Sequence, residues 1–580
     1  MAASLCAQTG FFPIGEIRPG MQATGRTVFS GSRIEEFQVE ILGVLENTGP
    51  RQSLILARLS GGPLASTGVL QGMSGSPVYI GGRLAGAVAM AFSYSKEPIA
   101  AIRPIEDLLR AGEGTAERRQ RARASLTDTD LTRGFAPVET VAAGGAKLVD
   151  IATPVSFGGF TQSAIEHFAP QLRALGLEPR QALTGGGRLK PGLGDPASLE
   201  PGSMISVQVL TGDMSVGAEG TVTYIDGRRV YAFGHHFLSI GSTDIPFARA
   251  DVLTLVPNLS TSFKISAPRE WMGTIREDRS TGVAGEMGRQ ARMTPFSISV
   301  TRPGARGSAA ARSAYQMEMV NDRYLSPILV QMAVLSAIEA TERTVGAETL
   351  AIRSEVQFQG KTAPIRFSNT YAGESSLPQQ ASLGVAVPLA YALQSDFDEL
   401  QLKNVRVEVD SYYELKQMQI DQVWTSRREV TPGESVDLTV VLSGPNSQEK
   451  SRTVTYRVPL GAPTGPLYFT VADGTTTDYT EFRQTLTASP RTPSQLVTFL
   501  NALRDNTKAY VRVWRAEADY GVQGQSFPAP PPSVAQILAR AQPGLGSAAL
   551  SRNSKVAELI IEGDGMVISG SKTVQVEIRE

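Results

Sequence analysis

The chain has 580 residues, of which 41% are hydrophobic, 19% charged and 7% aromatic, and its formal net charge is -1. This length predicts three or more domains, and the balanced charge argues against a nucleic-acid or anionic-membrane partner. No segment approaches the run of about 18 apolar residues that a membrane-spanning helix needs. The single cysteine, Cys6, excludes an internal disulfide and a cysteine-based zinc site.

Residues 1–10 predict either the remnant of an export signal or a disordered N-terminus. The export reading places the protein in the periplasm, in the cell envelope or among secreted proteins. Leu5 stands where a lipid-attachment motif around Cys6 would need a small residue, so lipidation is not expected.

Residues 11–110 predict a β-rich unit. Residues 37–44 and 53–59 alternate like strands, and a hairpin is expected around the turn at Gly81 and Gly82. Just before this hairpin, residues 72–77 read Gly-Met-Ser-Gly-Ser-Pro. Ser74 is therefore a candidate nucleophile, because the glycines allow the backbone N–H groups of Gly72 and Ser74 to point at a carbonyl oxygen under attack.

Residues 111–200 predict a linker that contains one helix. The helix is expected from about Thr161 to Leu175, with His167 on its polar surface. The triple glycine at 185–187 lacks both a preceding strand and a following Lys-Ser/Thr, which excludes a phosphate-binding loop.

The β pattern returns in residues 201–292. Two strands, 220–225 and 229–233, are joined at Asp226-Gly227 and end at Gly234-His235-His236. The chain has only 3 histidines, so this pair is a candidate for chemistry, although a structural role is the alternative. A short pattern, Tyr-Ile-x-Gly-Arg, occurs at 79–83 and again at 224–228, as two related barrels or chance would produce.

The C-terminal half predicts an α+β region over 293–400, with a helix over 325–342. An immunoglobulin-like β-sandwich is expected over 401–480 and a further α+β region over 481–580. Such modules are usually spacers or adhesive surfaces, and they are the candidate contact with an envelope protein partner. No metal-ligand pattern is visible in this half.

Three stretches resemble the SpoIVB-type serine peptidases of the chymotrypsin-like clan. They are residues 71–77, Gln-Gly-Met-Ser-Gly-Ser-Pro, the return strand 82–88, and Ala-Phe-Gly-His at 232–235, with a weaker match at 273–275 and 282–285. The resemblance implies that Ser74 is the nucleophile and His235 the general base, with His236 at a variable position. It also implies a protein or peptide substrate and no metal or organic cofactor.

The resemblance implies a mainly β protein built on a chymotrypsin-like double β-barrel. In the family the histidine half comes first, whereas here Ser74 precedes His235, so the barrels are expected in circularly permuted order. Activity depends on where the side chains meet and not on chain order.

The acidic member of the family's triad falls about 15 residues before the serine, according to the resemblance. Here that stretch, Leu-Ser-Gly-Gly-Pro at 59–63, has no carboxylate. Ser60, a backbone carbonyl or Asp244 could take its place, and the sequence leaves the choice open. It favours a serine endopeptidase with weakened activity, and the alternative is a non-catalytic envelope scaffold built on a degenerate peptidase fold.

Overall fold

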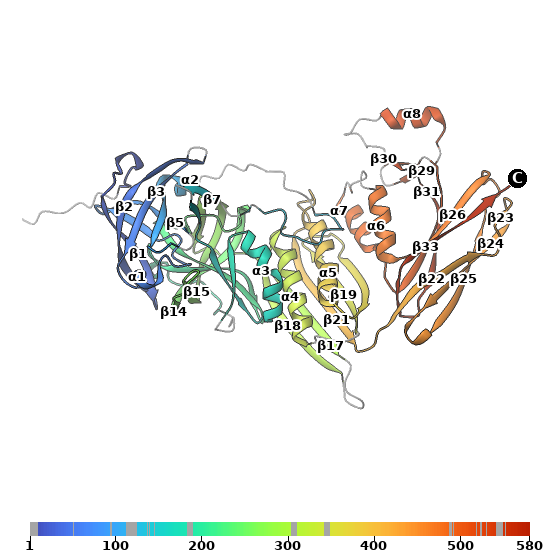
Figure 1. The fold of residues 1–580 in the computed structure, drawn as a ribbon, viewed down its shortest axis with the longest axis horizontal. Coiled ribbons are helices and arrows are strands. Elements are labelled where there is room, and N and C mark those ends of the chain that lie inside the picture. The colour runs from blue at the N-terminus through green and yellow to red at the C-terminus, as the bar shows by residue number, and fades with distance from the viewer. Residues whose placement is uncertain are drawn as a thin grey trace, which may run out of the picture. The chain divides into compact units, whose positions relative to one another are not determined.

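A computed structural model describes most of the chain, and strands dominate it (Figure 1). The described residues are 10–49, 52–92, 95–111, 124–135, 137, 140–143, 146–182, 189–302, 310–341, 348–485, 490, 492–517, 519–522, 525–528, 530–540, 549–551 and 553–580. Cys6 and the expected signal remnant therefore lie outside the described residues, apart from Gly10.

Two compact units divide the chain. The first holds residues 1–123, 130–296 and 315–336, and the second holds residues 124–129, 297–314 and 337–580. Ser74 and both candidate histidines belong to the first unit, so their geometry can be followed within one compact body.

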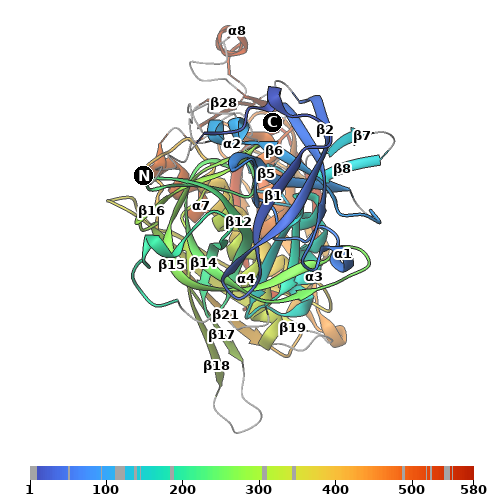
Figure 2. The ribbon, with the colours of Figure 1, turned by 90° about the vertical axis from the view of Figure 1, so that its left-hand side faces the viewer.

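The first unit opens with six strands that close on themselves. Their neighbours follow the order β1-β2-β3-β6-β5-β4, and β4 pairs back onto β1. We call these six strands ring A, and Figure 2 shows four of them, β1, β2, β5 and β6. The elements of this segment are η1 (Ile14–Glu16), β1 (Gln22–Ser30), β2 (Arg33–Gly49), β3 (Gln52–Ser60), α1 (Leu64–Thr67), β4 (Pro77–Ile80), β5 (Arg83–Phe92), β6 (Ile99–Pro104) and α2 (Ile105–Ala111).

Alternation of apolar side chains gives each of these strands one face that is buried in a shared core. In β3, for example, Ile55, Ala57 and Leu59 are buried on one face, as the period of a strand requires. They join a single core cluster with residues of β1, β2, β4 and β5. The predicted strands 37–44 and 53–59 and the predicted hairpin are thereby confirmed.

The segment expected to be a linker is more structured than predicted. It contains β7 (Thr140–Ala143), β8 (Ala146–Asp150), β9 (Thr153–Gly158), α3 (Gln162–Ala174), β10 (Leu177–Gln181) and η2 (Pro196–Ser198). Its strands are short, and their partners come from distant parts of the chain, so the sequence did not reveal them. β8 pairs with β5, and β9 pairs with β12. The predicted helix is present with Thr161 as its N-cap, and His167 is exposed on it.

A second closed set of six strands, ring B, follows. Its elements are β11 (Met204–Gly212), β12 (Ser215–Asp226), β13 (Arg229–Ala232), β14 (Gly241–Val256), β15 (Phe263–Arg279) and β16 (Gly282–Met287). The neighbours run β11-β12-β13-β16-β15-β14, and β14 pairs back onto β11. In order of appearance both rings therefore follow 1-2-3-6-5-4.

The repeated Tyr-Ile-x-Gly-Arg pattern does not mark equivalent places in the two rings. At 79–83 it forms the turn between the fourth and fifth strands of ring A, whereas at 224–228 it forms the turn between the second and third strands of ring B. The pattern therefore does not support a relation between the barrels, and the alternative of chance stands, because both copies reflect the chemistry of a tight hairpin and not common placement.

Three elements carry residues of both units: β17 (Met293–Arg302), β18 (Ala311–Val320) and α4 (Leu325–Thr341). The last of these confirms the predicted helix over 325–342. In the second unit, β19 (Glu348–Phe358) pairs with β20 (Ile365–Gly373) and with β21 (Leu402–Tyr412). Helix α5 (Leu377–Leu393) follows β20.

The rest of the second unit contains two sheets around one apolar core. Their neighbour orders are β25-β24-β22-β32 and β23-β33-β26-β27-β31. The elements after β21 are β22 (Gln417–Thr425), β23 (Glu429–Val430), β24 (Ser435–Ser443), η3 (Pro445–Ser447), β25 (Glu449–Arg457), β26 (Gly465–Asp473), α6 (Gly474–Thr485), α7 (Pro493–Asn501), β27 (Lys508–Arg515), β28 (Asp519–Val522), β29 (Gln525–Pro528), α8 (Pro532–Arg540), β30 (Ala549–Ser551), β31 (Ser554–Glu562), β32 (Val567–Ser569) and β33 (Ser571–Ile578).

These two sheets extend beyond the sandwich range expected from the sequence. Strands from residues 508–578 complete both sheets, while residues 402–412 pair with β19 instead. The sequence could not assign these partners, because alternation shows which residues are buried and not which strand lies alongside.

Candidate active site

The serine loop, residues 71–76, connects α1 to β4 and turns at two glycines. Gly72 has φ 89° and Gly75 has φ 90°, values that residues with a side chain rarely adopt. The turn is closed by the backbone N–H of Ser76, which donates to the carbonyl oxygen of Met73 at 2.9 Å. Ser74 is 0% exposed. The local spacing of glycines predicted from the sequence therefore produces a tight turn with the serine at its centre.

Strand β12 of ring B holds the serine loop in place. The hydroxyl of Thr221 donates to the carbonyl oxygen of Gly72 at 2.8 Å, and that of Thr223 donates to the carbonyl oxygen of Gly75 at 2.7 Å. The backbone N–H of Thr221 also donates to the carbonyl oxygen of Ser74 at 2.9 Å. Three carbonyl oxygens of the serine loop thus accept hydrogen bonds from β12. The N–H groups of the loop take no part in these bonds.

Two of those N–H groups remain available. Among the hydrogen bonds of the described residues, neither the N–H of Gly72 nor that of Ser74 acts as a donor. Unpaired N–H groups in a buried turn are uncommon, and two of them beside a serine are what the stabilisation of an oxyanion requires.

The histidine loop, residues 233–240, connects β13 to β14 and is anchored by a buried carboxylate. Asp278 accepts backbone N–H groups at 2.8, 2.8 and 3.2 Å, from Phe237, Leu238 and Ile240. At the other end of the loop, Nε of the buried Arg103 donates to the carbonyl oxygen of Gly234 at 2.9 Å. These bonds fix the backbone that carries both histidines.

The two loops meet at one carbonyl oxygen of β5. Val88 accepts the N–H of Gly75 at 2.8 Å, and a Cβ atom added to Gly234 would lie 3.0 Å from the same oxygen. A Cβ atom added to Gly75 would lie 2.5 Å from the backbone nitrogen of Phe233. The structure therefore brings the serine loop of ring A against the histidine loop of ring B.

The His235 ring is neutral and 2% exposed. Burial lowers its pKa to about 3, and the carbonyl of His236 acts in the opposite direction. Nδ1 lies 2.8 Å from that carbonyl oxygen, so the N–H is placed on Nδ1 and Nε2 keeps its lone pair. This is the tautomer that a general base needs. Among the described residues, neither Nε2 nor the hydroxyl of Ser74 has a hydrogen-bond partner, so the two are not bonded to each other.

The two acid substitutes suggested by the sequence lie in other surroundings. Ser60 is exposed at the end of β3. Asp244 pairs with Arg276 at 2.7 Å and accepts the backbone N–H of Arg292 at 2.9 Å. Within the described ranges, no hydrogen bond or ion pair links either residue to His235.

Sequence reasoning missed a carboxylate beside the histidine loop. Asp150, at the end of β8, has its Oδ2 atom 3.9 Å from Nδ1 of His236, and both side chains are buried. The signal was an acid within the apolar stretch Leu-Val-Asp-Ile at 148–151, since a buried acid usually has a partner. His236, expected to be a variable neighbour of His235, faces this carboxylate.

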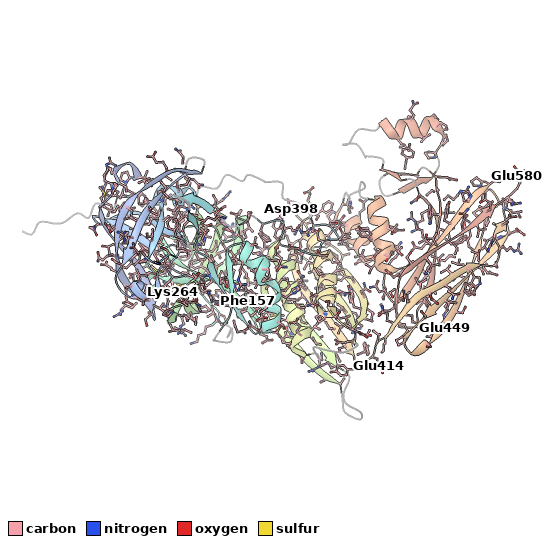
Figure 3. The ribbon with its side chains drawn as sticks, in the orientation of Figure 1. Phe157, Lys264, Asp398, Glu414, Glu449 and Glu580 are labelled. Atoms are coloured by element: carbon pink, nitrogen blue, oxygen red, sulfur yellow. The ribbon has the colours of Figure 1, made fainter. Side chains whose placement is uncertain are left out.

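Two further buried ionisable groups lie near the serine loop. The Lys264 side chain, labelled in Figure 3, would come within 3.3 Å of a Cβ atom on Gly72, and its Nζ donates to the hydroxyl of Thr27 at 2.7 Å. Burial lowers the pKa of Lys264 to about 7. Glu219, on β12, has its pKa raised to about 8 by burial. In each case burial disfavours the charged form, so Glu219 holds its proton at neutral pH although Arg180 acts in the opposite direction.

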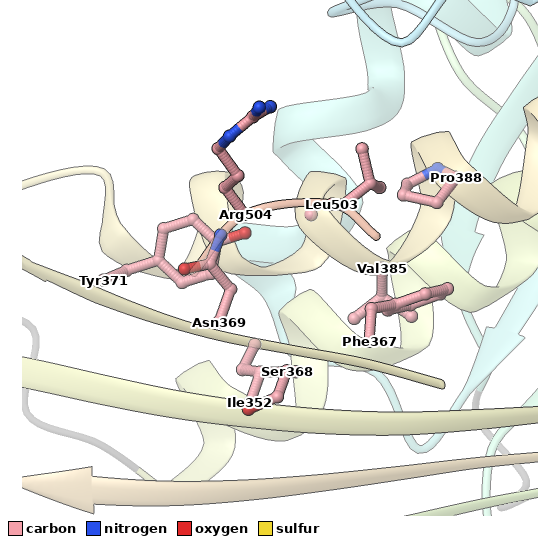
Figure 4. A pocket seen from close by; sticks show the side chains of 10 residues that line it. Ile352, Phe367, Ser368, Asn369, Tyr371, Val385, Pro388, Leu503 and Arg504 are labelled. Carbon is pink, nitrogen blue, oxygen red and sulfur yellow. The ribbon is translucent and has the colours of Figure 1, made fainter. Parts of the chain in front are cut away.

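Each unit contains a cavity, and no residue of the serine loop or the histidine loop lines either one. In the first unit a cavity of about 90 Å³ is bordered by Leu193, Trp271 and Glu318. In the second unit a cavity of about 50 Å³ lies between β19, β20 and α5, where Tyr371, Val385 and Arg504 contribute to its wall (Figure 4). Neither cavity is lined by Ser74 or His235.

Comparison with known proteins bears on the serine-bearing segment. Residues 14–98 match the family model described as SpoIVB peptidase S55. This match confirms the resemblance to SpoIVB-type peptidases for the segment that carries Ser74. The matched range ends before His235.

No curated protein matches the chain. Among solved structures, a superantigen-like protein from Staphylococcus aureus in complex with sialyl-Lewis X covers 36% of this chain and 93% of its own, at 12% identity and a TM-score of 0.11. At that score the likeness carries no argument. No helix in the described residues is long and apolar enough to cross a bilayer, and no group of three or more His, Cys, Asp or Glu side chains there could hold a metal ion.

We expect Gly75→Ala to destabilise the first unit by more than about 3 kcal/mol, because left-handed strain adds to a steric clash. The new Cβ atom would lie 2.1 Å from the carbonyl oxygen of Thr221. Gly81→Ala is the matched control, since Gly81 also has positive φ but nothing lies within 4 Å of its added Cβ; it should cost about 1–2 kcal/mol. Urea unfolding measures both, and equal losses would contradict the packing described here.

Glu219 should make the protein less stable as pH rises from 4.5 to 8. The folded state holds a proton in this window, because its pKa is raised to about 8 from an ordinary value of 4.5, whereas the unfolded state has released it. The slope is at most about 1.4 kcal/mol per pH unit. Glu219→Gln keeps a neutral polar side chain and should remove this component. Denaturant unfolding at several pH values measures it, and parallel curves for the two proteins would refute the assignment.

Proposed function

We propose that this protein is a serine peptidase that cleaves protein or peptide substrates through an acyl-enzyme. Ser74 is the nucleophile, His235 is the general base, and the N–H groups of Gly72 and Ser74 bind the oxyanion. The observation that carries the proposal is the meeting of the two loops at the carbonyl oxygen of Val88. The family match of residues 14–98 supports it independently.

The reaction follows from the positions of these groups. Nε2 of His235 accepts the hydroxyl proton of Ser74 while the serine oxygen bonds to the carbonyl carbon of the substrate. Negative charge that develops on the carbonyl oxygen is stabilised by the two free N–H groups. The C–N bond then breaks as the imidazolium returns its proton to the leaving amine, and water releases the acyl group from Ser74 by the reverse sequence of proton transfers.

The two rings are, in this proposal, the halves of a chymotrypsin-like peptidase in circularly permuted order. Both follow the strand order 1-2-3-6-5-4, and each presents its functional loop between its third and fourth strands. Chain order does not affect the chemistry, because triads occur in several orders on unrelated chains.

A backbone carbonyl takes the place of the missing acid on His235. The oxygen of His236 orients the ring through Nδ1, but a carbonyl dipole stabilises an imidazolium less than a carboxylate does. Replacing the acid of a triad can lower turnover by about 10⁴ while leaving a residual rate from the oxyanion site. We therefore propose a weak peptidase.

The setting is also part of the proposal. We place the protein outside the cytoplasm, on the strength of residues 1–10 and the family match, and assign the two sheets of the second unit to an immunoglobulin-like module that contacts an envelope protein partner. No metal or organic cofactor enters the proposed reaction.

One observation favours the alternative of a non-catalytic scaffold. Ser74 and His235 are both buried, and their reactive atoms are not hydrogen-bonded to each other. A scaffold that inherited these residues would need neither access nor this bond.

A fluorophosphonate probe separates the two functions. Because the probe reacts only with an activated serine, labelling of the wild-type protein is expected to disappear in Ser74→Ala and to fall by at least about 10²-fold in His235→Ala, the usual range for a general base. His167→Ala, on the exposed face of α3, serves as the control and should label like the wild type. Absence of labelling at every pH from 5 to 8, both in the wild type and in the Val149→Pro and Ile151→Ser proteins, would support the scaffold.

A further inference from the structure

One edge of β5 carries three partners in succession. β4 pairs with residues 83–87 of β5, beginning at Pro77 opposite Ala87. Next along the edge, Val88 binds the serine loop through Gly75. β8 then pairs with β5 in the register Met90↔Asp150, Ala91↔Val149 and Phe92↔Leu148. Whatever pairs with this last part of the edge therefore lies next to the candidate nucleophile.

The end of β8 reaches the site itself. The N–H of Ile151 donates to the carbonyl oxygen of Ala89 at 3.0 Å, one residue beyond Val88. The carbonyl of Ile151 lies close enough to the His235 ring to act against the effect of burial on its pKa. Asp150, the preceding residue, faces His236 at 3.9 Å. Two consecutive residues of β8 and its extension thus contact the histidine loop.

The side chain of Ile151 packs into the apolar core of ring A. It is 5% exposed and belongs to the core cluster that includes Leu70, Met73 and Val88. Because Met73 precedes Ser74 and Val88 binds the residue after it, the cluster that holds Ile151 borders the serine loop.

We propose that residues 148–151 are an intramolecular pseudosubstrate, which occupies the edge of β5 where an extended peptide substrate binds. This inference rests on the proposed function and adds a substrate class to it. Strand addition of this kind uses backbone hydrogen bonds for affinity and alternate side chains for specificity. The substrate therefore carries an aliphatic residue at the place of Ile151, preceded by an acidic residue that faces His236.

The pseudosubstrate must leave the edge before a substrate can bind. Its displacement is opposed by the pairing of β8 with β5 and by the seating of Ile151, so any change that weakens either contact exposes Ser74. Val149 is the residue to alter, because its side chain is only half-buried and it stands opposite Ala91. This pair lies two positions along the ladder from Ile151 and Ala89, which are joined by a backbone hydrogen bond. Alternate residues of an antiparallel ladder share the same bonding geometry.

Val149→Pro removes one backbone donor from this pairing. Lys147→Ala is the matched control, because Lys147 is exposed on the same strand but does not itself pair with β5. Loss of one hydrogen bond, about 1 kcal/mol, should raise the rate of fluorophosphonate labelling of Ser74 by about fivefold to tenfold. The control should label at the wild-type rate. Ile151→Ser, which empties the apolar seat without changing the backbone donors, should act in the same direction if Val149→Pro does not fold.

A binding measurement tests the same inference without catalysis. In a Ser74→Ala background, a fluorescent hexapeptide Ala-Lys-Leu-Val-Asp-Ile should bind to the full-length Val149→Pro or Ile151→Ser protein, as followed by anisotropy. It should not bind to the Lys147→Ala protein, and replacing its terminal Ile by Asp should weaken binding by about tenfold or more, since burying a charge in an apolar seat is unfavourable.

The outcomes separate this inference from the proposed function. Hexapeptide binding without any labelling would retain the pseudosubstrate site and refute the peptidase. Labelling that is unchanged in the folded Val149→Pro and Ile151→Ser proteins, together with no hexapeptide binding, would overturn the pseudosubstrate and leave the peptidase standing.

Discussion

The carbonyl oxygen of Val88 is the contact on which the site depends. It accepts the N–H of Gly75 from one loop, and Gly234 of the other loop lies so near that an added Cβ atom would sit 3.0 Å away. Close approach here is a matter of space, because only a residue without a side chain lets two backbones share one strand edge. The glycines therefore do more than shape two turns. They allow the loop that carries the serine and the loop that carries the histidine to pack against each other.

Burial of Ser74 and His235 has two opposite consequences for chemistry. It keeps His235 neutral with a free lone pair on Nε2, and it strengthens any hydrogen bond to a developing charge. The same burial excludes a substrate. Residues 148–151 contribute to this burial, because they pair with β5 next to the serine loop and place Asp150 3.9 Å from His236 of the histidine loop. The segment that connects the two rings thus also packs beside the candidate site.

The lack of a carboxylate at 59–63 has a structural counterpart. His235 is oriented by a neutral carbonyl, whereas the nearby carboxylates serve other groups: Asp278 anchors the backbone of the histidine loop, and Asp150 faces His236. A carbonyl fixes the tautomer of the ring without supplying a counter-charge. In the proposed peptidase, the carbonyl of His236 therefore orients the ring without the charge stabilisation that one acid provides in a complete triad.

The sequence by itself determined the features that depend on neighbours along the chain. Glycines spaced around Ser74 imply a tight turn, alternation gives the strands of ring A, and continuous apolar character gives the helix that begins at Leu325, because each of these follows from residues within one or two turns of one another. Tertiary structure alone decided the rest. Asp150, Glu219 and Lys264 owe their surroundings to strands that are distant in the chain, and so do the closure of both rings and the late strands of the C-terminal sheets. Alternation records that a residue is buried, but the identity of the strand beside it is fixed only when the whole chain packs.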